Sequence, residues 1–234
     1  MANLRTVSVV IPAHQAEQTI AETIGSVLRQ SVPPFEVIVV DDGSTDRTED
    51  VVRSVVGVRY LRQEHAGAAA ARNRGVEAAS GELIAFVDAD DLWEPDKLEL
   101  QMAAWDRDPA ADMVFGHMVE FVSPELSAEE AAGLSPRPGV LSGLSPITLL
   151  MKRERFLATG GFQTHWQLGE FIEWYARVQR EGLRTLLVPE VVARRRLHAG
   201  NHGHANRGQS SEYARIVKQA LDLRRAQAAA KKPA

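Results

Sequence analysis

Short apolar runs alternate, over the first half of the chain, with longer segments whose apolar residues recur at helical spacing. Runs of this length, bounded by Pro, Gly or charged residues, are typical of buried strands in a parallel sheet. Such strands are predicted over residues 7–11, 35–40, 58–61 and 81–87. Helices are predicted between and after them, over residues 17–30, 48–55, 66–79 and 95–105. The alternation predicts an α/β fold with right-handed crossover connections.

The pattern changes from residue 113 onward. Residues 113–122 are predicted to form a strand of a mixed sheet, and residues 123–145, rich in Pro, Gly, Ala and Ser, a long loop. The remaining elements are a short strand and helix over 147–158, a helix over 170–181, a strand over 186–193 and a polar loop over 198–208. A terminal helix over 210–229 carries one apolar stripe, which either packs on the rest of the protein or docks on a partner or an anionic membrane surface.

Acidic residues stand at the ends of two predicted strands. Asp41 and Asp42 end the second strand, while Asp88, Asp90 and Asp91 follow the fourth. The carboxyl ends of parallel strands meet at one edge of a sheet, where open α/β folds bind ligands. A divalent cation such as Mg²⁺ or Mn²⁺ would relieve the repulsion between these carboxylates. The alternatives are a solvated acidic loop that caps the next helix and, for the first pair, an ordinary polar turn.

Composition narrows the classes of function. The 234 residues carry a formal net charge of −4, which argues against nucleic acid as the main partner. Cys is absent, which excludes disulfides, thiolate metal sites and a Cys nucleophile. The amino end lacks the apolar segment of a signal peptide, and no stretch reaches transmembrane length. A cytoplasmic location is expected, and association with a membrane surface is compatible with the sequence but not required by it.

Two arginines lie in the segment AARNRG, on or near the third predicted helix. Arg72 and Arg74 offer donors in the fixed fork that suits a diphosphate, although a solvated helix face would look the same. No G-x-G-x-x-G follows the first strand, which argues against a dinucleotide-binding fold.

Three segments of the first half together resemble a known family. They are VSVVIPAHQAEQTIAETIGSVLRQS, FEVIVVDDGSTDRT and GAAAARNRGVEAASGELIAFVDADD, and the match runs from residue 7 to residue 100. They resemble a family 2 glycosyltransferase of the GT-A fold. The resemblance implies a Rossmann-like, mainly parallel central sheet flanked by helices, with a mixed-sheet acceptor half. Residues 1–110 would form the nucleotide-sugar-binding half, 111–208 the acceptor-binding half of the same domain, and 209–234 a C-terminal helix and tail.

The resemblance also implies roles for residues at the motif positions. Donor-binding residues would be Pro12, Ala13 and Glu17 in the nucleotide pocket, Asp42 facing the base, Arg72 near the diphosphate or ribose, and Asp88 near the ribose. Through the D-x-D pattern, Asp90 would bind the divalent cation, Mn or Mg.

The second half resembles the family in shorter stretches, RERFLATGGF, LGEFIEWYARV and RRRLHAGNHG. The second stretch makes Glu170 the expected general base, while Phe171 stands where Asp is common. Helical spacing assigns Phe171 to the core and pairs Glu173 with Arg177, which leaves Glu170 at the cleft. The alternative is that Glu170 only caps the helix. Trp174 is expected on the polar face with Glu170.

The third stretch resembles a late loop that completes the donor site. By motif position His198 would reach the metal and Arg196 the diphosphate. A surface loop would carry the same residues.

The resemblance implies an inverting, metal-dependent glycosyltransferase that moves a sugar from a UDP-, GDP- or dTDP-sugar to an unidentified acceptor. The alternative of the same fold is a non-catalytic nucleotide-sugar-binding module. A receiver-like signalling domain would need about half this length and a well-placed Lys after a later strand. A nucleotidyltransferase would favour a basic, Gly-rich loop where this chain has PAHQAEQ.

Overall fold

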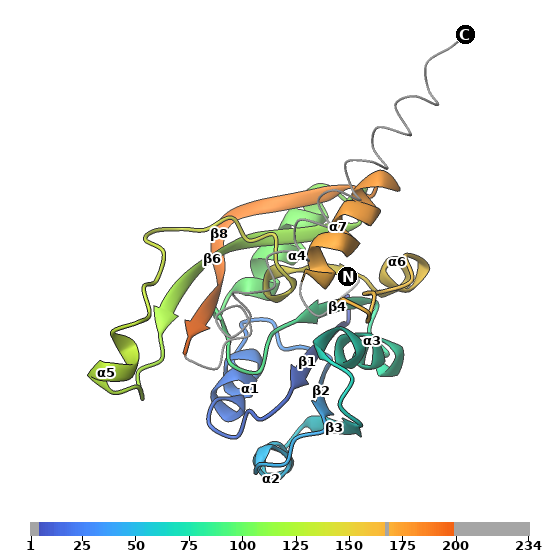
Figure 1. Cartoon of the computed structure of the whole chain (residues 1–234). Helices are drawn as coiled ribbons and strands as arrows, with labels where there is room; N and C mark the ends of the chain where they lie inside the picture. The colour runs from blue at the N-terminus through green and yellow to red at the C-terminus, as the bar shows by residue number, and fades with distance from the viewer. Residues whose placement is uncertain (1–4, 167–168, 199–234) are drawn as a thin grey trace.

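A mixed sheet of eight strands forms the centre of the computed structural model, which describes residues 5–166 and 169–198 (Figure 1). The strand order is β3-β2-β1-β4-β7-β6-β8-β5. The strands are β1 (Val7–Ala13), β2 (Glu36–Asp42), β3 (Val58–Gln63), β4 (Leu83–Phe86), β5 (Leu92–Trp93), β6 (Met113–Val122), β7 (Leu150–Lys152) and β8 (Thr185–Leu197). The helices are α1 (Ile20–Leu28), α2 (Thr48–Arg53), α3 (Ala68–Ala78), α4 (Lys97–Arg107), α5 (Ala128–Ala131), η1 (Pro146–Thr148), α6 (Arg153–Ala158) and α7 (Glu170–Arg180).

The first four strands pair in parallel and bring their carboxyl ends to one edge. β1 lies between β2 and β4, and β3 extends the sheet beyond β2. In this register Ala13 faces Asp41, Asp42 faces Gln63, and Val10 faces Phe86. Asp88 therefore emerges beside the end of β1, close to the acids of β2. The alignment explains why residues far apart in sequence share one edge of the sheet.

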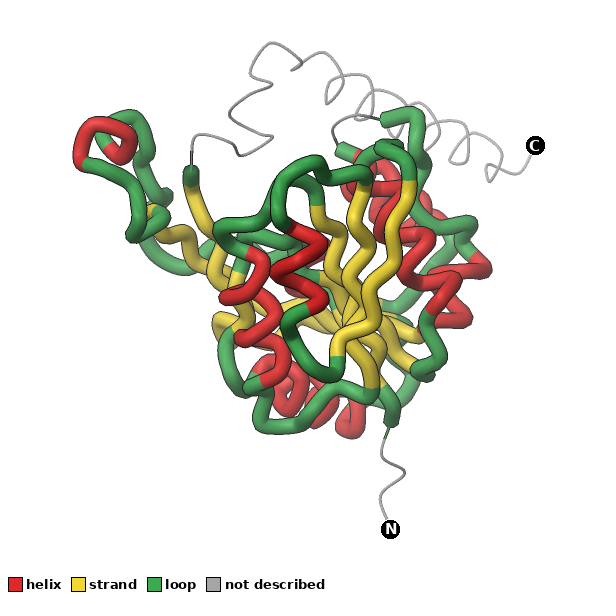
Figure 2. The backbone as a smooth tube through the Cα atoms, turned by 90° about the horizontal axis from the view of Figure 1, so that it is seen from below, coloured by secondary structure: helices red, strands yellow, loops and turns green. Residues whose placement is uncertain are grey.

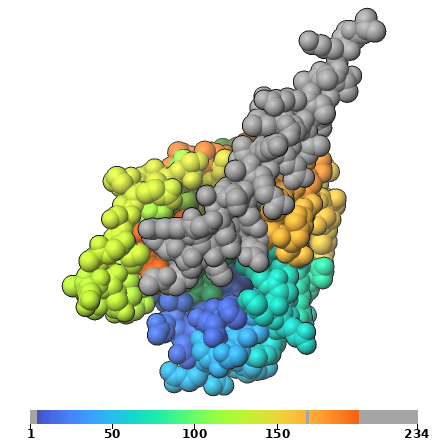
Figure 3. Space-filling view, in the orientation of Figure 1, coloured from blue at the N-terminus to red at the C-terminus, as the bar shows by residue number. Residues whose placement is uncertain are grey.

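The second half of the sheet is mixed. β7 pairs antiparallel with both β4 and β6, β8 runs parallel to β6, and the short β5 pairs antiparallel with β8. Because β4 pairs with β7, one continuous sheet joins the two halves of the chain. β6 and β8 also extend beyond the body of the molecule beside the segment that carries α5 (Figures 1 and 2). In the space-filling view this segment, residues 123–145, forms the left margin of the molecule (Figure 3).

Helices cover both faces of the sheet (Figure 2). One apolar core contains α1, α2 and α4 together with alternate residues of β1 such as Val9 and Ile11. The other contains α3, α6 and α7 with Val10 of the same strand. Adjacent strand residues thus enter different cores, which is why these strands are apolar without interruption.

The α7 side is rich in aromatic rings. Phe156, Phe162 and Trp174 pack with ring centroids 5.1 to 5.8 Å apart, and all three are buried. Phe171 packs on Trp174 and Phe115 in the same core. This confirms the prediction that Phe171 serves packing.

The structure corrects several predicted elements. Residues 123–145 include the short helix α5, whose Ser127 and Glu130 form a capping box, although a loop was predicted. The last strand extends to Leu197 rather than ending at residue 193, because β6 continues beside it. The strand β5 was not predicted. The predicted terminal helix over 210–229, and the predicted loop beyond residue 198, lie outside the described residues.

The first residue of α4, Lys97, is a buried lysine that has no acidic hydrogen-bond partner among the described residues. Lys97 is fully buried, its Nζ is 2.5 Å from Gln101 Oε1, and it lies over the Trp93 ring. Gln101 in turn donates to the carbonyl oxygens of Val114 and Thr148. Burial holds the pKa of Lys97 well below its usual value. Burial thus disfavours the charged ammonium in the folded state.

This lowered pKa predicts a pH dependence of stability. Between the folded-state pKa of Lys97 and its unfolded value near 10.5, the unfolded chain binds more protons, so stability rises with pH by up to about 1.4 kcal/mol per pH unit. Lys97→Met should remove that slope, measured by urea unfolding between pH 7 and 9.5. Lys152→Met, at a partly exposed lysine, serves as the control and should retain the slope. Equal slopes in all three proteins would contradict the assignment.

Candidate functional site

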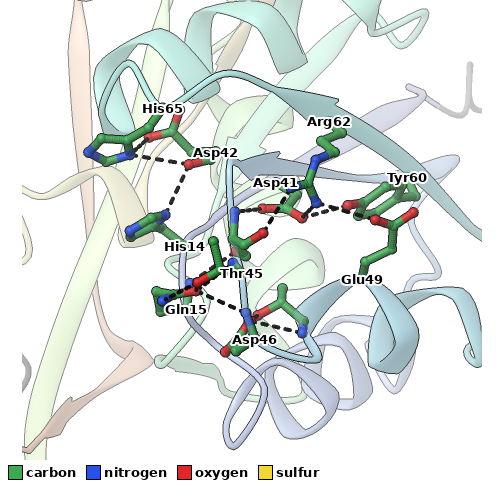
Figure 4. A network of polar contacts seen from close by, with 12 residues as sticks. His14, Gln15, Asp41, Asp42, Thr45, Asp46, Glu49, Tyr60, Arg62 and His65 are labelled. Carbon is green, nitrogen blue, oxygen red and sulfur yellow. Dashed lines mark hydrogen bonds and ion pairs between the residues drawn. The ribbon is translucent and has the colours of Figure 1, made fainter.

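Asp42, at the end of β2, organises the loop that leads into α3 (Figure 4). Its Oδ1 accepts from Ala66 N at 2.8 Å and Gln63 Nε2 at 2.7 Å, and its Oδ2 accepts from Gly67 N at 2.8 Å. Burial by itself would raise the pKa of Asp42, but these hydrogen bonds and nearby His65 lower it below the usual value. The carboxylate is therefore ionised, and its hydrogen bonds hold the loop before α3 in place.

Two histidines adjoin Asp42, and both were missed by the sequence analysis. The His14 and His65 ring centroids are 4.4 Å apart with the rings tilted by 32°. Their Nδ1 atoms lie 2.9 and 3.2 Å from the Asp42 carbonyl oxygen, and His65 Nδ1 lies 2.9 Å from Asp42 Oδ2. Both side chains are exposed. The sequence does place His14 directly after Ala13 and His65 shortly before Gly67, and these positions next to predicted site segments were the only sequence signal for the two histidines.

The loop after β1 is held by the loop after β2. Gln15 has a left-handed φ of 51°, which costs energy for a residue other than Gly. Its amide nitrogen donates to Ser44 Oγ at 3.0 Å, and its side-chain oxygen accepts from Thr45 N at 2.8 Å. Glu17 Oε2 likewise accepts from Arg47 N at 2.9 Å. Pro12 and Ala13 are buried just before this loop. Glu17 therefore joins two loops at the sheet edge.

Asp41 supports the same edge from inside. Its carboxylate accepts from Tyr60 Oη at 2.5 Å, Ser44 N at 2.8 Å and Arg62 Nη1 at 3.3 Å (Figure 4). Burial, together with the hydrogen bond to Asp41, raises the pKa of Tyr60 above its usual value. Tyr60 therefore stays protonated and keeps donating.

The D-x-D segment is fixed through its backbone. The hydroxyls of Thr19 and Thr23, at the start of α1 and within it, each donate to the Ala89 carbonyl at 2.9 Å. With the backbone held, the Asp90 carboxylate lies partly exposed and 2.9 Å from His198 Nε2. The structure thus brings together the two residues that the sequence analysis assigned to a metal.

Asp91 points the other way. It is buried, and its Oδ1 accepts from Arg196 N at 2.8 Å. Burial first, and then the neighbouring charges of Asp90 and Asp88, raise the pKa of Asp91 well above its usual value. Negative charge is therefore crowded at this edge.

Arg196 lies inside the protein. It is fully buried on β8, and its Nε donates to the Asp90 carbonyl at 2.7 Å. Its terminal nitrogens contact Ser123 Oγ at 3.1 Å and the carboxylates of Glu22 and Glu125. In this structure Arg196 connects β8 to the D-x-D segment. Its predicted contact with a diphosphate is a separate expectation.

Arg72, on α3, connects the two halves of the chain. Its Nη2 lies 2.6 Å from Asp88 Oδ1, and its Nη1 lies 2.9 Å from Glu170 Oε1 at the start of α7. Burial alone would lower the pKa of Arg72, but Asp88 and then Glu170 raise it above its usual value. The guanidinium therefore stays charged between two carboxylates.

Helix α7 separates two acids that were candidates for the base. Glu173 accepts from Arg177 Nε at 3.2 Å, which confirms the predicted pair. Trp174 was expected on the polar side, and that expectation is wrong, because the residue is fully buried. Glu170 remains partly exposed at the helix start.

The chemistry of the donor set fits a hard divalent cation. Asp88 and Asp90 offer carboxylate oxygens, which suit both Mg²⁺ and Mn²⁺, and His198 offers an imidazole nitrogen, which suits the transition metal Mn²⁺ better than Mg²⁺. Within residues 5–166 and 169–198 no group of three or more His, Asp or Glu side chains is placed to hold an ion. Mg²⁺ is commonly held by one or two carboxylates together with substrate phosphates and water. The pair Asp90 and His198 fits that mode.

Comparison with known proteins identifies the family. A model described as glycosyl transferase family 2 matches residues 8–140, more than half of the chain. The chain belongs to glycosyl transferase family 2.

Two curated relatives match part of the chain. It is 46% identical over 102 residues to TuaG of Bacillus subtilis, provisionally named a teichuronic acid biosynthesis glycosyltransferase. It is 44% identical over 100 residues to WfgD of Escherichia coli, named a UDP-Glc:α-D-GlcNAc-diphosphoundecaprenol β-1,3-glucosyltransferase. The two matches cover 41% and 42% of this chain and 40% of each relative. The chain therefore matches less than half the length of these relatives.

The structural comparison extends across both halves. The structure of S. aureus TarS 1-349 in complex with UDP-GlcNAc aligns with a TM-score of 0.68 at 23% identity. The alignment covers 84% of this family 2 chain and 60% of TarS. The fold is of the GT-A type, as predicted.

Across residues 5–166 and 169–198, no helix has both the length and the apolar character needed to cross a bilayer.

The hydrogen bonds of Asp42 predict its contribution to stability. Asp42→Asn places an amide nitrogen where backbone N–H groups donate, so unfolding free energy at pH 7 should fall by about 2 kcal/mol. The folded-state pKa is below 3.8, so this contribution is present above pH 3.8 and disappears as pH falls through the folded value. Chemical unfolding of Asp42→Asn and wild type at pH 7 and pH 3 tests this. Asp50→Asn, at an exposed acid, is the control, and a pH-independent difference would contradict the prediction.

Proposed function

We propose that this chain transfers a sugar from a nucleotide-diphosphate donor to an acceptor with inversion at the sugar carbon, using Glu170 as general base. One observation carries the proposal. The guanidinium of Arg72 contacts both Glu170, from the second half of the chain, and Asp88, which follows β4 at the carboxyl edge of the parallel strands. The two carboxylates therefore lie close to each other. A base beside the place where a donor sugar would sit is the arrangement that direct displacement needs.

The proposed reaction is a single displacement. The acceptor hydroxyl oxygen forms a bond to the anomeric carbon as the bond from that carbon to the diphosphate oxygen breaks, and its electron pair leaves with the diphosphate. The hydroxyl proton goes to Glu170. The Oε1 of Glu170 is engaged by Arg72, while within the described residues its Oε2 accepts no hydrogen bond. Oε2 is therefore the proposed proton acceptor.

A divalent cation fits the proposal at Asp90 and His198, with Asp88 beside them. When bound, such a cation neutralises negative charge on the leaving diphosphate. The chain's own contribution is to hold these ligands: Thr19 and Thr23 fix the backbone between the two acids, and Arg196 fixes the Asp90 carbonyl.

The names of the relatives support a choice of donor. WfgD is named for UDP-Glc, and TarS structures contain UDP or UDP-GlcNAc. UDP-glucose and UDP-GlcNAc are thus the first donors to test here, ahead of GDP- and dTDP-sugars. The acceptor stays unassigned. A cytoplasmic location, with or without contact with a membrane surface, stays a prediction from the sequence.

The second candidate function is a binding module that does not turn its donor over. Phe171 occupies the position where the family commonly has Asp, which favours this alternative. The burial of Phe171 among Phe115 and Trp174 explains the residue by packing. Glu170 keeps an acid at the helix start, so transfer remains the proposal.

Substitution of Asp90 tests the metal site. Asp90→Ala should keep the fold, because the side chain lies partly exposed after a strand end. It should abolish the gain in UDP affinity on adding Mn²⁺, measured by calorimetric titration with and without the ion. Asp106→Ala is the control and should retain the gain, because Asp106 pairs with Arg5 and not with a residue of the proposed metal site. A gain that survives in Asp90→Ala would disprove the site.

Substitution of Glu170 tests the base. Glu170→Gln keeps a hydrogen-bond acceptor for Arg72 but cannot take a proton, so UDP affinity should hold while the rate of UDP release from a UDP-sugar falls by about a hundredfold or more. Glu173→Gln is the matched control on the same helix and should cost little in rate, because Glu173 is paired with Arg177. If the two effects are reversed, Glu173 is the base. If neither matters, the binding module is favoured.

A further inference from the structure

Arg72 is buried between Asp88, at the carboxyl edge of the parallel strands, and Glu170, at the start of α7. Its side chain is 5% exposed, and its two terminal nitrogens contact Asp88 and Glu170. Its Nε is also buried and has no hydrogen-bond partner among residues 5–166 and 169–198. The guanidinium carbon lies 5.9 Å from the centroid of the Phe162 ring, which helps to enclose it. The whole fork is thus inside the protein and directed at the two carboxylates.

The helix that carries Arg72 is fixed on both sides. Asn73 donates to the Phe162 carbonyl at 2.7 Å and accepts from Phe162 N at 2.9 Å, which attaches α3 to the turn before α7. On the sheet side, a Cβ at Gly75 would lie 2.2 Å from Val10 Cγ1, so α3 approaches β1 as closely as a glycine allows. The Arg72 backbone is therefore set relative to both halves of the chain.

We propose that Arg72 is a positioning residue for the base, holding Glu170 at a fixed place relative to Asp88 instead of serving as a contact for the donor diphosphate. This inference rests on the proposed function of Glu170. By engaging Oε1, Arg72 turns Oε2 of Glu170 toward the acceptor, and the same guanidinium fixes Oδ1 of Asp88. The base and the D-x-D segment then keep their spacing as a unit.

The burial of Arg72 distinguishes positioning from donor binding. A contact with the diphosphate would require Nη1 or Nη2 to leave a carboxylate. That would break one ion pair of a guanidinium that is only 5% exposed and leave a partly buried carboxylate, Asp88 or Glu170, without its opposite charge, which is unfavourable. A lysine cannot replace the arginine, because its single ammonium lacks the planar fork that spans two acids.

The test is a double-mutant cycle between Arg72→Lys and Glu170→Gln. For Arg72→Lys we expect kcat for UDP release from UDP-glucose or UDP-GlcNAc to fall by at least about tenfold, because a small displacement of a reacting group is costly. The KM for the donor and the affinity for UDP with Mn²⁺ should stay within about threefold, since Arg72 does not touch the donor. In the Glu170→Gln background, Arg72→Lys should add little further loss, because both changes act through one carboxylate.

Arg177→Lys is the matched control. Arg177 forms the other Arg–Glu pair of α7 and also donates to the Gly161 carbonyl, so its loss should lower the melting temperature without lowering kcat. A general effect of disturbing this helix would lower kcat in Arg177→Lys as well, which would overturn the positioning role.

The failures of the two proposals are distinguishable. If Glu170→Gln leaves the rate unchanged, the proposed base is wrong. If Glu170→Gln slows the reaction but Arg72→Lys multiplies that loss and weakens UDP binding more than tenfold, the base stands and Arg72 binds the donor, which overturns this inference. If Arg72→Lys does not fold, a crystal structure of the wild-type protein with UDP and Mn²⁺ decides. Arg72 still on Glu170 and Asp88 supports positioning, and Arg72 on the diphosphate overturns it.

Discussion

The structure depends on how it neutralises the carboxylates that parallel strands deliver to one edge of the sheet. The register places Asp41 and Asp42 beside the exit of β1, and Asp88, Asp90 and Asp91 follow the next strand over. The repulsion among these carboxylates is offset by a different interaction at each position. Backbone N–H groups and side-chain donors bind the first pair, Arg72 pairs with Asp88, and burial raises the pKa of Asp91. Asp90, which meets His198, faces outward.

These solutions also join parts of the chain that are distant in sequence. Arg72 pairs with an acid 16 residues away and another 98 residues away. Arg196 reaches back from β8 to the D-x-D backbone and to α1. The charges that suit a ligand site thus also hold the two halves of the sheet together. A substitution at these charged residues is expected to affect stability and binding at once.

The sequence predicted the parallel half well because its signals are local. Each strand there is a short apolar run, and each crossover carries helical spacing, so both period and boundaries are visible in the residues. The Glu173–Arg177 pair also follows from helical spacing, whereas the roles of the D-x-D acids and of Glu170 were expected from the family resemblance. What failed was decided by tertiary contacts. β5 exists because β8 pairs with it, and β8 extends through three arginines because β6 runs beside it.

Tertiary contacts also explain the site residues that the sequence did not reveal or whose surroundings it did not predict. His14 and His65 meet only because two loops converge on Asp42, which spacing does not show. Arg196 was expected at a diphosphate from its motif position, and in the structure its guanidinium is buried and contacts the Asp90 carbonyl, Ser123 Oγ and the carboxylates of Glu22 and Glu125. Burial of a charged group depends on elements that lie far away in sequence, and local pattern carries no information about it.

Helix α7 carries its polar residues on one face and its core residues on another. Glu170 and Glu173 are three residues apart, and Arg177 lies four beyond the second, so these polar groups follow one face. Phe171 and Val178 follow the apolar face, and Trp174 lies between the two faces, where the rings of Phe156 and Phe162 draw it into the core. An acid at position 171 would enter that core without a partner, which is unfavourable. Given this aromatic core, the proposed base lies at the first residue of the helix, where Glu170 contacts Arg72.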